Sequence, residues 1–300
     1  MTGAGRYAPS PSGDLHLGNL RTAVLAWVLA RRSGRAFHLR VEDLDRVRAG
    51  AEQRQLEDLA ALGIDWDGPV VRQSERGGAH AAAIADLQEA GLVYECFCTR
   101  REILEAPSAP HAPPGAYPGT CRDLDPGAQE AGRARMAQLR RAPALRLRAG
   151  VDRASVHDMF AGTVTAAVDD LVLRRGDGVV AYNLAVVVDD AAAGVDQVVR
   201  GDDLLTSAPR QAHLARLLGL PVPEYAHVPL AVNRDGARLA KRDGAVTLRD
   251  RLELGESAAQ VMGRIGDSLG LPGCTSAADV LARWDPAAPP DAPWVVELPG

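Results

Sequence analysis

The chain has 300 residues, of which 46% are hydrophobic and 24% charged, and its formal net charge is −5. This composition is typical of a globular protein with a sizeable core, and the acidic balance excludes a broadly basic nucleic-acid-binding protein, so that any RNA contact must be a local patch. The sequence shows no signal peptide and no apolar run near about 18 residues, and it has four Cys. We therefore expect a cytoplasmic protein with reduced thiols and no membrane contact.

The N-terminal stretch Arg6-Tyr-Ala-Pro-Ser-Pro-Ser-Gly-Asp-Leu-His16-Leu-Gly18-Asn19 places a turn rich in Pro, Ser and Gly directly before a periodic apolar pattern. That pattern predicts a helix that ends at Gly34. A helix N-terminus offers free N–H groups and the positive end of the helix dipole, Gly18 leaves room for a phosphate, and His16 can donate to it. The stretch predicts a nucleotide-triphosphate site, although the Walker and GxGxxG spacings are absent.

Strands and helices alternate over most of the chain, which predicts an α/β fold with a parallel sheet. A strand is expected at 37–42, and helices at 51–62, 79–90 and 209–218. The alternation stops at 94–150, where Cys, Pro and Arg predict an insertion, and it resumes with the segments 168–174, 179–188 and 195–200. The last fifty residues predict one or two helices and a Pro-rich tail. Ligands of such sheets bind at the carboxyl ends of the strands, where the strand order reverses.

Arg40, Glu42, Asp43 and Asp45 cluster at the end of the first predicted strand after the helix. A carboxylate at this place can bind an ammonium group, a ribose or a metal ion, or it can belong to an ion-pair network.

Arg200 follows a short apolar run and is therefore expected at the carboxyl end of a strand. A guanidinium group forks onto a carboxylate through two parallel hydrogen bonds, which suits recognition of a carboxylate substrate. The alternative is a structural ion pair with Asp202 or Asp203.

The insertion contains Cys96-Phe-Cys98 followed by Tyr117-Pro-Gly-Thr-Cys121, a spacing that is plausible for zinc. The chemistry of zinc favours His111 as the fourth ligand, and Tyr117 is the other candidate; the alternative to a metal site is three free thiols. Seven Arg near this cluster form either a patch that tracks an RNA backbone or solvated helix faces, namely Arg100, Arg101, Arg122, Arg133, Arg135, Arg140 and Arg141.

A second basic loop, Asp235-Gly-Ala-Arg238-Leu239-Ala240-Lys241-Arg242, is flanked by Gly. It resembles the Lys-Met-Ser-Lys-Ser signature of the class I aminoacyl-tRNA synthetases, and His16-Leu-Gly18-Asn19 resembles their His-Ile-Gly-His signature. The segment Arg-Val-Glu42-Asp-Leu-Asp is similar to Arg-Ile-Glu-Asp-Leu-Asp of glutamyl-tRNA synthetase-like enzymes. Tyr182-Asn-Leu-Ala and Val-Arg200-Gly-Asp-Asp are similar to their Tyr-Asn-Phe-Ala and Ile-Arg-Gly-Glu-Asp segments. Ala240 and Arg238 depart from the second signature.

This resemblance runs from Arg6 to about Leu248 and implies a Rossmann-type nucleotide-binding sheet with a zinc-bearing insertion and a short helical C-terminal region. The expected parts are 1–93 and 166–220 for the two halves of the sheet domain, 94–165 for the insertion with its zinc cluster and acceptor-RNA contacts, and 221–300 for the second signature and the C-terminal region. The resemblance also implies Tyr117 as the fourth zinc ligand, with Cys96, Cys98 and Cys121.

The site residues that the resemblance implies fall into three groups. His16 and Lys241 are the catalytic candidates. The residues expected to bind ATP are Pro9, His16, Gly18, Asn19, Arg238, Leu239 and Lys241. The residues expected to bind glutamate are Arg6, Tyr7, Ala8, Pro9, Ser10, Glu42, Tyr182 and Arg200. The expected cofactors are one structural Zn²⁺ and Mg²⁺ bound with ATP, and a monomer is expected.

The sequence stops about fifty residues after Lys241, which is too short for a large anticodon-binding region. It thus resembles the short members of the family, which activate L-glutamate with ATP and transfer it to the queuosine base in the anticodon loop of tRNA(Asp). Three alternatives remain: a truncated glutamyl-tRNA synthetase that charges a tRNA 3′ end, a paralogue that uses a small-molecule or protein acceptor, and a non-catalytic tRNA-binding module.

Overall fold

The structure of the chain, a computed structural model, describes residues 3–105, 116–239, 244, 246–290 and 292–297. Its main element is a seven-stranded sheet with the order β3-β2-β1-β9-β10-β6-β7. The strands are β1 (Ala4–Tyr7), β2 (Ala36–Val41), β3 (Val71–Arg72), β6 (Arg153–Asp158), β7 (Gly162–Ala167), β9 (Val195–Gly201) and β10 (Glu224–Val228). All pairings are parallel except that of β6 with β7. The predicted α/β fold with a parallel sheet is therefore confirmed.

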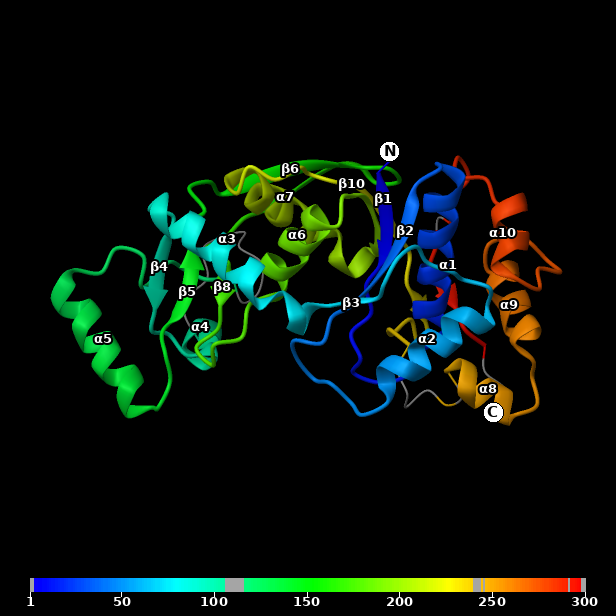
Figure 1. Cartoon of the computed structure of the whole chain (residues 1–300), viewed down its shortest axis with the longest axis horizontal. Coiled ribbons are helices and arrows are strands. Elements are labelled where there is room, and N and C mark those ends of the chain that lie inside the picture. Colours follow the sequence, from blue (N-terminus) through cyan, green and yellow to red (C-terminus); the bar gives the residue numbers. More distant parts are fainter. Residues whose placement is uncertain (1–2, 106–115, 240–243, 245, 291, 298–300) are drawn as a thin grey trace.

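The strand order reverses at the centre of this sheet. After β1 the chain moves outward to β2 and β3 on one side, and after β9 it moves to β10 on the other. Because βαβ crossovers are right-handed, the helices that follow these two strands cover opposite faces. In Figure 1, α1, which follows β1, lies on one side of β1, and α7, which follows β9, lies on the other. The carboxyl ends of β1 and β9 therefore form the switch point at which such sheets bind ligands.

Five helices accompany the large sheet. They are α1 (Leu17–Arg32), α2 (Ala51–Ala61), α3 (Gly77–Glu89), α6 (Tyr182–Ala192) and α7 (Ala208–Leu217). Four of them lie where the sequence predicts helices, whereas no helix was predicted for α6, which occupies most of the segment 179–188. Two short 3-10 helices, Gln73–Arg76 and Asp202–Ser207, precede α3 and α7. Gly34 and Gly63 follow α1 and α2 with φ of 68° and 79°, the left-handed conformation that ends a helix at glycine.

The insertion forms a second, smaller body. Its antiparallel sheet has the order β4-β5-β8, and the helices α4 and α5 lie beside it at the far end of the molecule in Figure 1. The elements are β4 (Val93–Cys96), α4 (Arg100–Glu105), α5 (Pro126–Gln138), β5 (Ala144–Leu147) and β8 (Val172–Arg174). The segment between β5 and β8 returns to the large sheet as β6 and β7, so the chain passes between the two bodies more than once.

The C-terminal part packs against α1. It contains α8 (Leu248–Glu253), α9 (Ala258–Asp267) and α10 (Ala277–Arg283), with β11 (Ala231–Val232) paired to β12 (Trp294–Val295). The expectation of one or two helices in the last fifty residues is confirmed, because α9 and α10 lie wholly within them and α8 begins just before. All three helices begin at Thr or Ser caps, whose side chains accept from backbone N–H groups.

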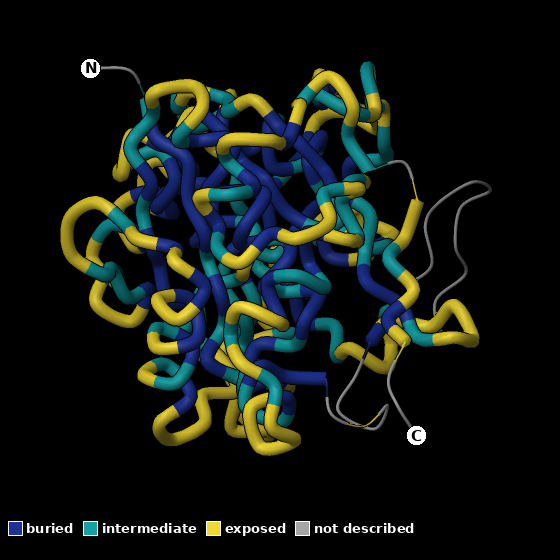
Figure 2. Tube along the Cα trace, turned by 90° about the vertical axis from the view of Figure 1, so that its right-hand side faces the viewer, coloured by how far each residue is buried: buried dark blue, intermediate teal, exposed yellow. Residues whose placement is uncertain are grey.

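The buried hydrophobic residues of the described part of the chain fall into four clusters, and the dark segments inside Figure 2 mark buried parts of the chain. The largest cluster surrounds α1, whose residues Leu17, Leu20 and Leu25 are fully buried. Removing such side chains from water is the main favourable contribution to folding. Within the described residues no helix is long and apolar enough to cross a membrane.

Candidate active site

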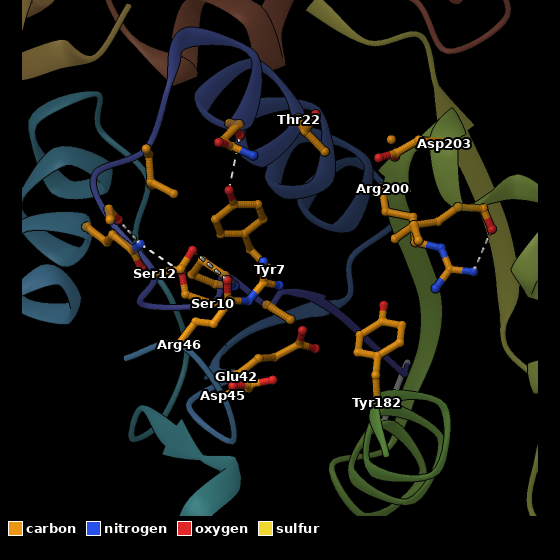
Figure 3. Close-up of a pocket in the computed structure, with 18 of the residues that line it drawn as sticks. Tyr7, Ser10, Ser12, Thr22, Glu42, Asp45, Arg46, Tyr182, Arg200 and Asp203 are labelled. Carbon is orange, nitrogen blue, oxygen red and sulfur yellow. Dashed lines mark hydrogen bonds between the residues drawn. The ribbon is translucent and has the colours of Figure 1, made fainter. Parts of the chain in front are cut away.

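A cavity of about 970 Å³ opens at the carboxyl ends of β1 and β9, where the strand order reverses. Figure 3 shows Glu42, Tyr182 and Arg200 around the same space. The sequence-predicted residues that line the cavity are Arg6, Tyr7, Ala8, Pro9, Ser10, His16, Gly18, Asn19, Glu42, Tyr182, Arg200 and Arg238. Residues that are up to 232 positions apart in the sequence thus meet in one place.

His16 is the N-cap of α1. Its Nδ1 accepts a hydrogen bond from the Asn19 N–H at 3.2 Å, and Asn19 Oδ1 accepts from the His16 N–H at 3.3 Å. Because Nδ1 is the acceptor, the neutral imidazole carries its proton on Nε2. Burial, and secondly the charge of Arg238, lower the pKa of His16 to about 4. His16 is therefore a neutral donor at physiological pH.

Gly18 lies in the first turn of α1, at the floor of the cavity. A Cβ at this position would lie 2.6 Å from the Ala231 Cβ and 3.1 Å from the His16 ring. Any side chain would therefore push the helix start away from β11 or displace His16. Gly18 was expected to leave room for a phosphate, and its packing against Ala231 and His16 also requires a residue without a side chain.

Three buried charges, Arg6, Arg40 and Asp190, and the partly buried Glu42 form a network between α6 and the ends of β1 and β2. Arg6 Nε and Arg40 Nη1 both donate to Asp190 Oδ1, at 3.3 and 2.5 Å, and Arg40 Nη2 donates to Glu42 Oε1 at 3.3 Å. Burial favours the protonated form of Asp190, but Arg40 and Arg6 outweigh it and hold its pKa below the usual range. The network fixes Glu42 as an acceptor beside the cavity, with its pKa raised by burial.

Arg200 stands at the carboxyl end of β9, as its position after an apolar run predicts. Its Nε donates to His227 Nε2 at 3.0 Å and its Nη2 to the Leu204 carbonyl at 3.4 Å, rather than to Asp202 or Asp203. The guanidinium also lies over the ring of Tyr225. Its Nη1 is buried and has no hydrogen-bond partner among the described residues, and an unpaired buried donor is costly unless a ligand satisfies it.

The aromatic and hydroxyl candidates take different positions around the cavity. The Tyr7 hydroxyl donates to the Asn19 carbonyl at 3.2 Å and is buried, so it holds the start of α1 in place. Tyr182 begins α6 and is 39% exposed, which leaves its ring open to the cavity. Ser10 Oγ is 3.2 Å from Ser12 Oγ.

The second signature is only partly described. Arg238 lines the cavity, and its Nη1 donates to Asp203 Oδ2 at 2.7 Å. Leu239 is 2% exposed and packs into the core rather than into the cavity. Lys241, Ala240 and Arg242 lie outside the described residues.

The three Cys of the insertion meet in a cluster that can hold a metal ion. The Sγ atoms of Cys96, Cys98 and Cys121 all lie within 4.8 Å of one another. The Tyr117 hydroxyl lies 3.4 Å from Cys96 Sγ and 3.9 Å from Cys98 Sγ, whereas His111 lies outside the described residues. Tetrahedral ligands about 2.3 Å from a zinc ion are about 3.8 Å apart, so this spacing fits zinc.

The seven Arg near the cluster do not all face solvent freely. Three of them form ion pairs with acids of the insertion and its neighbours: Arg122 with Asp170, Arg133 with Glu95, and Arg135 with Glu102. For these three, the contacts favour a structural role over an RNA contact.

Sequence reasoning missed three residues that organise the cavity. Asp190 binds Arg6 and Arg40, His227 accepts from Arg200, and Asp158 binds His227. Asp190 belongs to the run Val-Val-Val-Asp-Asp on α6, where two acids after an apolar stretch hinted at buried partners. Asp158 and His227 lie in strands, and nothing in the local sequence connects them with Arg200.

Comparison with known proteins agrees with this geometry. A family model described as "tRNA synthetases class I (E and Q), catalytic domain" matches residues 4–262. A curated protein from Nocardia farcinica named "Glutamyl-Q tRNA(Asp) synthetase" is 65% identical over 98% of this chain and 93% of its own length. One of the same name from Cutibacterium acnes is 52% identical over 90% of this chain and 76% of its own length. The fold, the cavity and the family model thus define a class I tRNA synthetase catalytic domain. The chain belongs to the glutamyl-Q tRNA(Asp) synthetase family within this class.

A solved structure supports the fold. The chain superimposes on a glutamate tRNA ligase from Elizabethkingia meningosepticum, solved in complex with its amino acid, with a TM-score of 0.80 at 24% identity. The match covers 98% of this chain and 67% of the ligase. At this identity the likeness shows the architecture alone.

Proposed function

We propose that this chain activates L-glutamate with ATP and transfers the glutamyl group to the queuosine base in the anticodon loop of tRNA(Asp). The observation that carries the glutamate part is the Nη1 of Arg200, which is buried without a hydrogen-bond partner among the described residues, beside a cavity that also holds Glu42 and Tyr182. A cation on one wall and an acid on another suit a ligand that carries both a carboxylate and an ammonium group.

Each end of glutamate has a partner in this proposal. The side-chain carboxylate binds Arg200, and the ammonium group binds Glu42 beside Tyr182. The arginines around Asp190 keep Glu42 in place, with Arg40 donating to it directly. A site built of fixed, buried partners rejects glutamine, because an amide in place of the carboxylate leaves Arg200 without its charge partner.

The first reaction joins the α-carboxylate of glutamate to the α-phosphorus of ATP. The carboxylate oxygen forms the new bond to phosphorus, and the bond to the β-phosphate bridging oxygen breaks, so that pyrophosphate leaves. The neutral His16 offers its Nε2–H to phosphate oxygens, and the N-terminus of α1 adds its dipole. By the resemblance of its motif, Lys241 binds the departing pyrophosphate, while Arg238, Gly18 and Asn19 border the nucleotide. Mg²⁺ bound with ATP supplies neutralising charge to the phosphates.

The second reaction releases AMP. A hydroxyl of the acceptor attacks the carbonyl carbon of the adenylate, the bond from that carbon to the phosphate oxygen breaks, and the hydroxyl proton leaves with the products. Catalysis in both steps rests on positioning and electrostatics, without a covalent protein nucleophile. The acceptor in this proposal is supported by the names of the similar proteins from Nocardia farcinica and Cutibacterium acnes.

We also propose one structural zinc ion bound by Cys96, Cys98, Cys121 and Tyr117. The distances between the Cys sulfurs and the Tyr117 hydroxyl support it. Such a site stabilises a small body with little core of its own, because it ties β4 to the loop before α5. Metal analysis of freshly purified protein should find about one zinc per chain, and its absence would remove this proposal.

The remaining expectations follow from the same reaction. ATP and tRNA are cytoplasmic, and all four Cys are unpaired, which supports a cytoplasmic protein. The expectation of a monomer stays a prediction.

The test uses labelled glutamate, ATP, Mg²⁺ and bulk tRNA, followed by nuclease mapping of the labelled fragment. We expect label in an anticodon-loop fragment of tRNA(Asp), and no label with tRNA that lacks queuosine. Label on the 3′-terminal adenosine would replace this function by that of a minimal glutamyl-tRNA synthetase. Glutamate-dependent pyrophosphate exchange without labelled RNA would keep the activation step and require another acceptor. Absence of both would contradict the proposed function.

A further inference from the structure

Two buried residues stand behind Arg200, on the side away from the cavity. His227 on β10 is 4% exposed, and Asp158 at the end of β6 is fully buried. His227 Nδ1 lies 2.6 Å from Asp158 Oδ2, and His227 Nε2 lies 3.0 Å from Arg200 Nε. The three side chains form a line that crosses the adjacent strands β6, β10 and β9.

The surroundings of Asp158 decide the direction of these hydrogen bonds. Its Oδ1 accepts from the N–H groups of Phe160 and Ala161, and its Oδ2 accepts from the N–H of His227. Burial raises the pKa of Asp158, but the side chain of His227 and then the N–H groups of Ala161 and Phe160 outweigh it and hold this pKa below its usual range. An ionised carboxylate only accepts, so His227 must donate from Nδ1.

The lone pair of His227 Nε2 therefore faces Arg200. Arg has only donors, and among the described residues His227 Nε2 is the acceptor for the Nε–H of Arg200. The carbonyl of Leu204 accepts from Nη2 of Arg200 at the longer distance of 3.4 Å, and Nη1 has no partner in the part of the chain that the structure describes. The hydrogen bond to His227 thus fixes the rotation of the Arg200 guanidinium plane from the side away from the cavity. The remaining donor, Nη1, is the one that a ligand can use.

We propose that Asp158 and His227 are positioning residues that fix the guanidinium of Arg200 for the carboxylate of the amino-acid substrate and so set the preference for a carboxylate over an amide. This inference rests on the proposed function, because it takes glutamate as the ligand of Arg200. Neither residue touches the substrate; both act through Arg200. The competing explanation is that they only join β6, β10 and β9.

Two substitutions of His227 separate these explanations. In His227→Gln the amide reaches the position of Nε2 and keeps an acceptor for Arg200, while the contact with Asp158 is lost. In His227→Asn the amide takes the position of Nδ1 and keeps the bond to Asp158, while the acceptor for Arg200 is lost. The two variants remove one hydrogen bond each at the same place. His213→Gln is the control. His213 lies on α7, outside the cavity, and its Nε2 is hydrogen-bonded to the Ala149 carbonyl.

The measurements are calorimetric binding of L-glutamate and L-glutamine to the intact chain, and glutamate-dependent pyrophosphate exchange with KM for glutamate and for ATP. We expect His227→Asn to weaken glutamate binding about tenfold or more, since hydrogen bonds to charged groups are among the stronger ones, with KM for ATP within about twofold of the original. The same variant should discriminate less between glutamate and glutamine. His227→Gln should stay within about threefold, and the control should be unchanged.

If both His227 variants weakened glutamate binding equally and raised KM for ATP to the same extent, the proposal would be overturned. His227 and Asp158 would then have a structural role alone. One measurement needs no variant: the ¹⁵N chemical shifts of His227 should report a neutral ring with its proton on Nδ1. A proton on Nε2 would overturn the proposal even if both variants failed to fold. If the original protein shows neither glutamate binding nor exchange, the proposed function fails, and this inference fails with it.

Discussion

The two sides of the cavity hold their charges in different ways. On the side that we propose binds the amino acid, Arg6, Arg40 and Asp190 are each no more than 6% exposed and share hydrogen bonds. On the side that we propose binds the nucleotide, Arg238 forms one ion pair with Asp203, and the two side chains are 58% and 31% exposed. Buried charges are costly to misplace, whereas an exposed pair contributes little and breaks easily.

This difference matches what each side has to recognise. A small amino acid is distinguished from its neutral analogue by a few fixed donors and acceptors, which favours a rigid, buried arrangement. Phosphates change charge and position during adenylate formation, and an exposed cation can follow them. The comparison implies that substitutions on the amino-acid side cost stability and specificity, while those on the nucleotide side cost little stability.

The largest expected effect comes from Asp190. In Asp190→Asn, Arg6 and Arg40 keep a partner of the same size but lose its charge, so we expect the unfolding free energy to fall by about 3–5 kcal/mol, as for a broken buried ion pair. Asp203→Asn is the matched control on the exposed side, with an expected loss of about 0–1 kcal/mol. Urea denaturation measures both. Similar losses in the two variants would contradict the comparison.

Arg200→Ala should weaken glutamate binding by about 2–5 kcal/mol, because it removes one partner of a buried charge pair. ATP binding should hardly change. Arg238→Ala provides the crossed control, since it should weaken ATP binding and leave glutamate binding nearly unaltered. Calorimetric titration of each variant with each ligand tests the pair. Arg200 would no longer be a candidate ligand if glutamate activation survived its replacement unaltered.

Much of this organisation can be predicted from the sequence, and the limits have physical causes. The helix after His16 shows a clear apolar period and a Gly stop, and the position of Arg200 follows from the run Val195–Val199 before it. Both signals are local. The segment 179–188 gave no such period, because α6 is apolar on most of its surface and packs between α3, α7 and β9.

The partners of the site residues could not be predicted in this way. Asp190 and Arg6 are 184 positions apart, and Asp158 and His227 are 69 apart. Such pairs form only when the order of strands brings them together, and the order β1-β9-β10-β6 is not encoded in any local pattern. A local sequence shows that a charge is present, and the topology decides which charge faces it.

Gly18 lies in the first turn of α1, between the two sides of the cavity, and a substitution there tests how tightly the start of this helix is packed. In Gly18→Ala the new Cβ would clash with Ala231, so we expect a loss of about 1–3 kcal/mol in unfolding free energy, as for other overpacked positions. Gly77→Ala is the control, because a Cβ at the start of α3 meets nothing within 4 Å and should be neutral or slightly stabilising. Thermal unfolding compares the two; equal effects would mean that α1 can shift at little cost.

The smallest expected effect links the two sides through His16. Its pKa is lowered to about 4 by burial and by Arg238, while Asp203 raises it. The unfolded chain binds a proton at this His near pH 6.5, and the folded chain does so only near pH 4. This residue therefore lowers stability progressively as the pH falls from 6.5 towards 4, and it contributes no titration to activity between pH 6 and 8.

Arg238 and Asp203 change the pKa of His16 less than burial does. Arg238→Ala should raise the pKa of His16, and Asp203→Asn should lower it further, because the two charges act on the imidazole with opposite signs. Titration of His16 by NMR in the three proteins measures these shifts directly. A pKa near 6.5 in the original protein would show that the N-cap of α1 is open to water, and the nucleotide side would then reach deeper into the cavity than its exposed ion pair indicates.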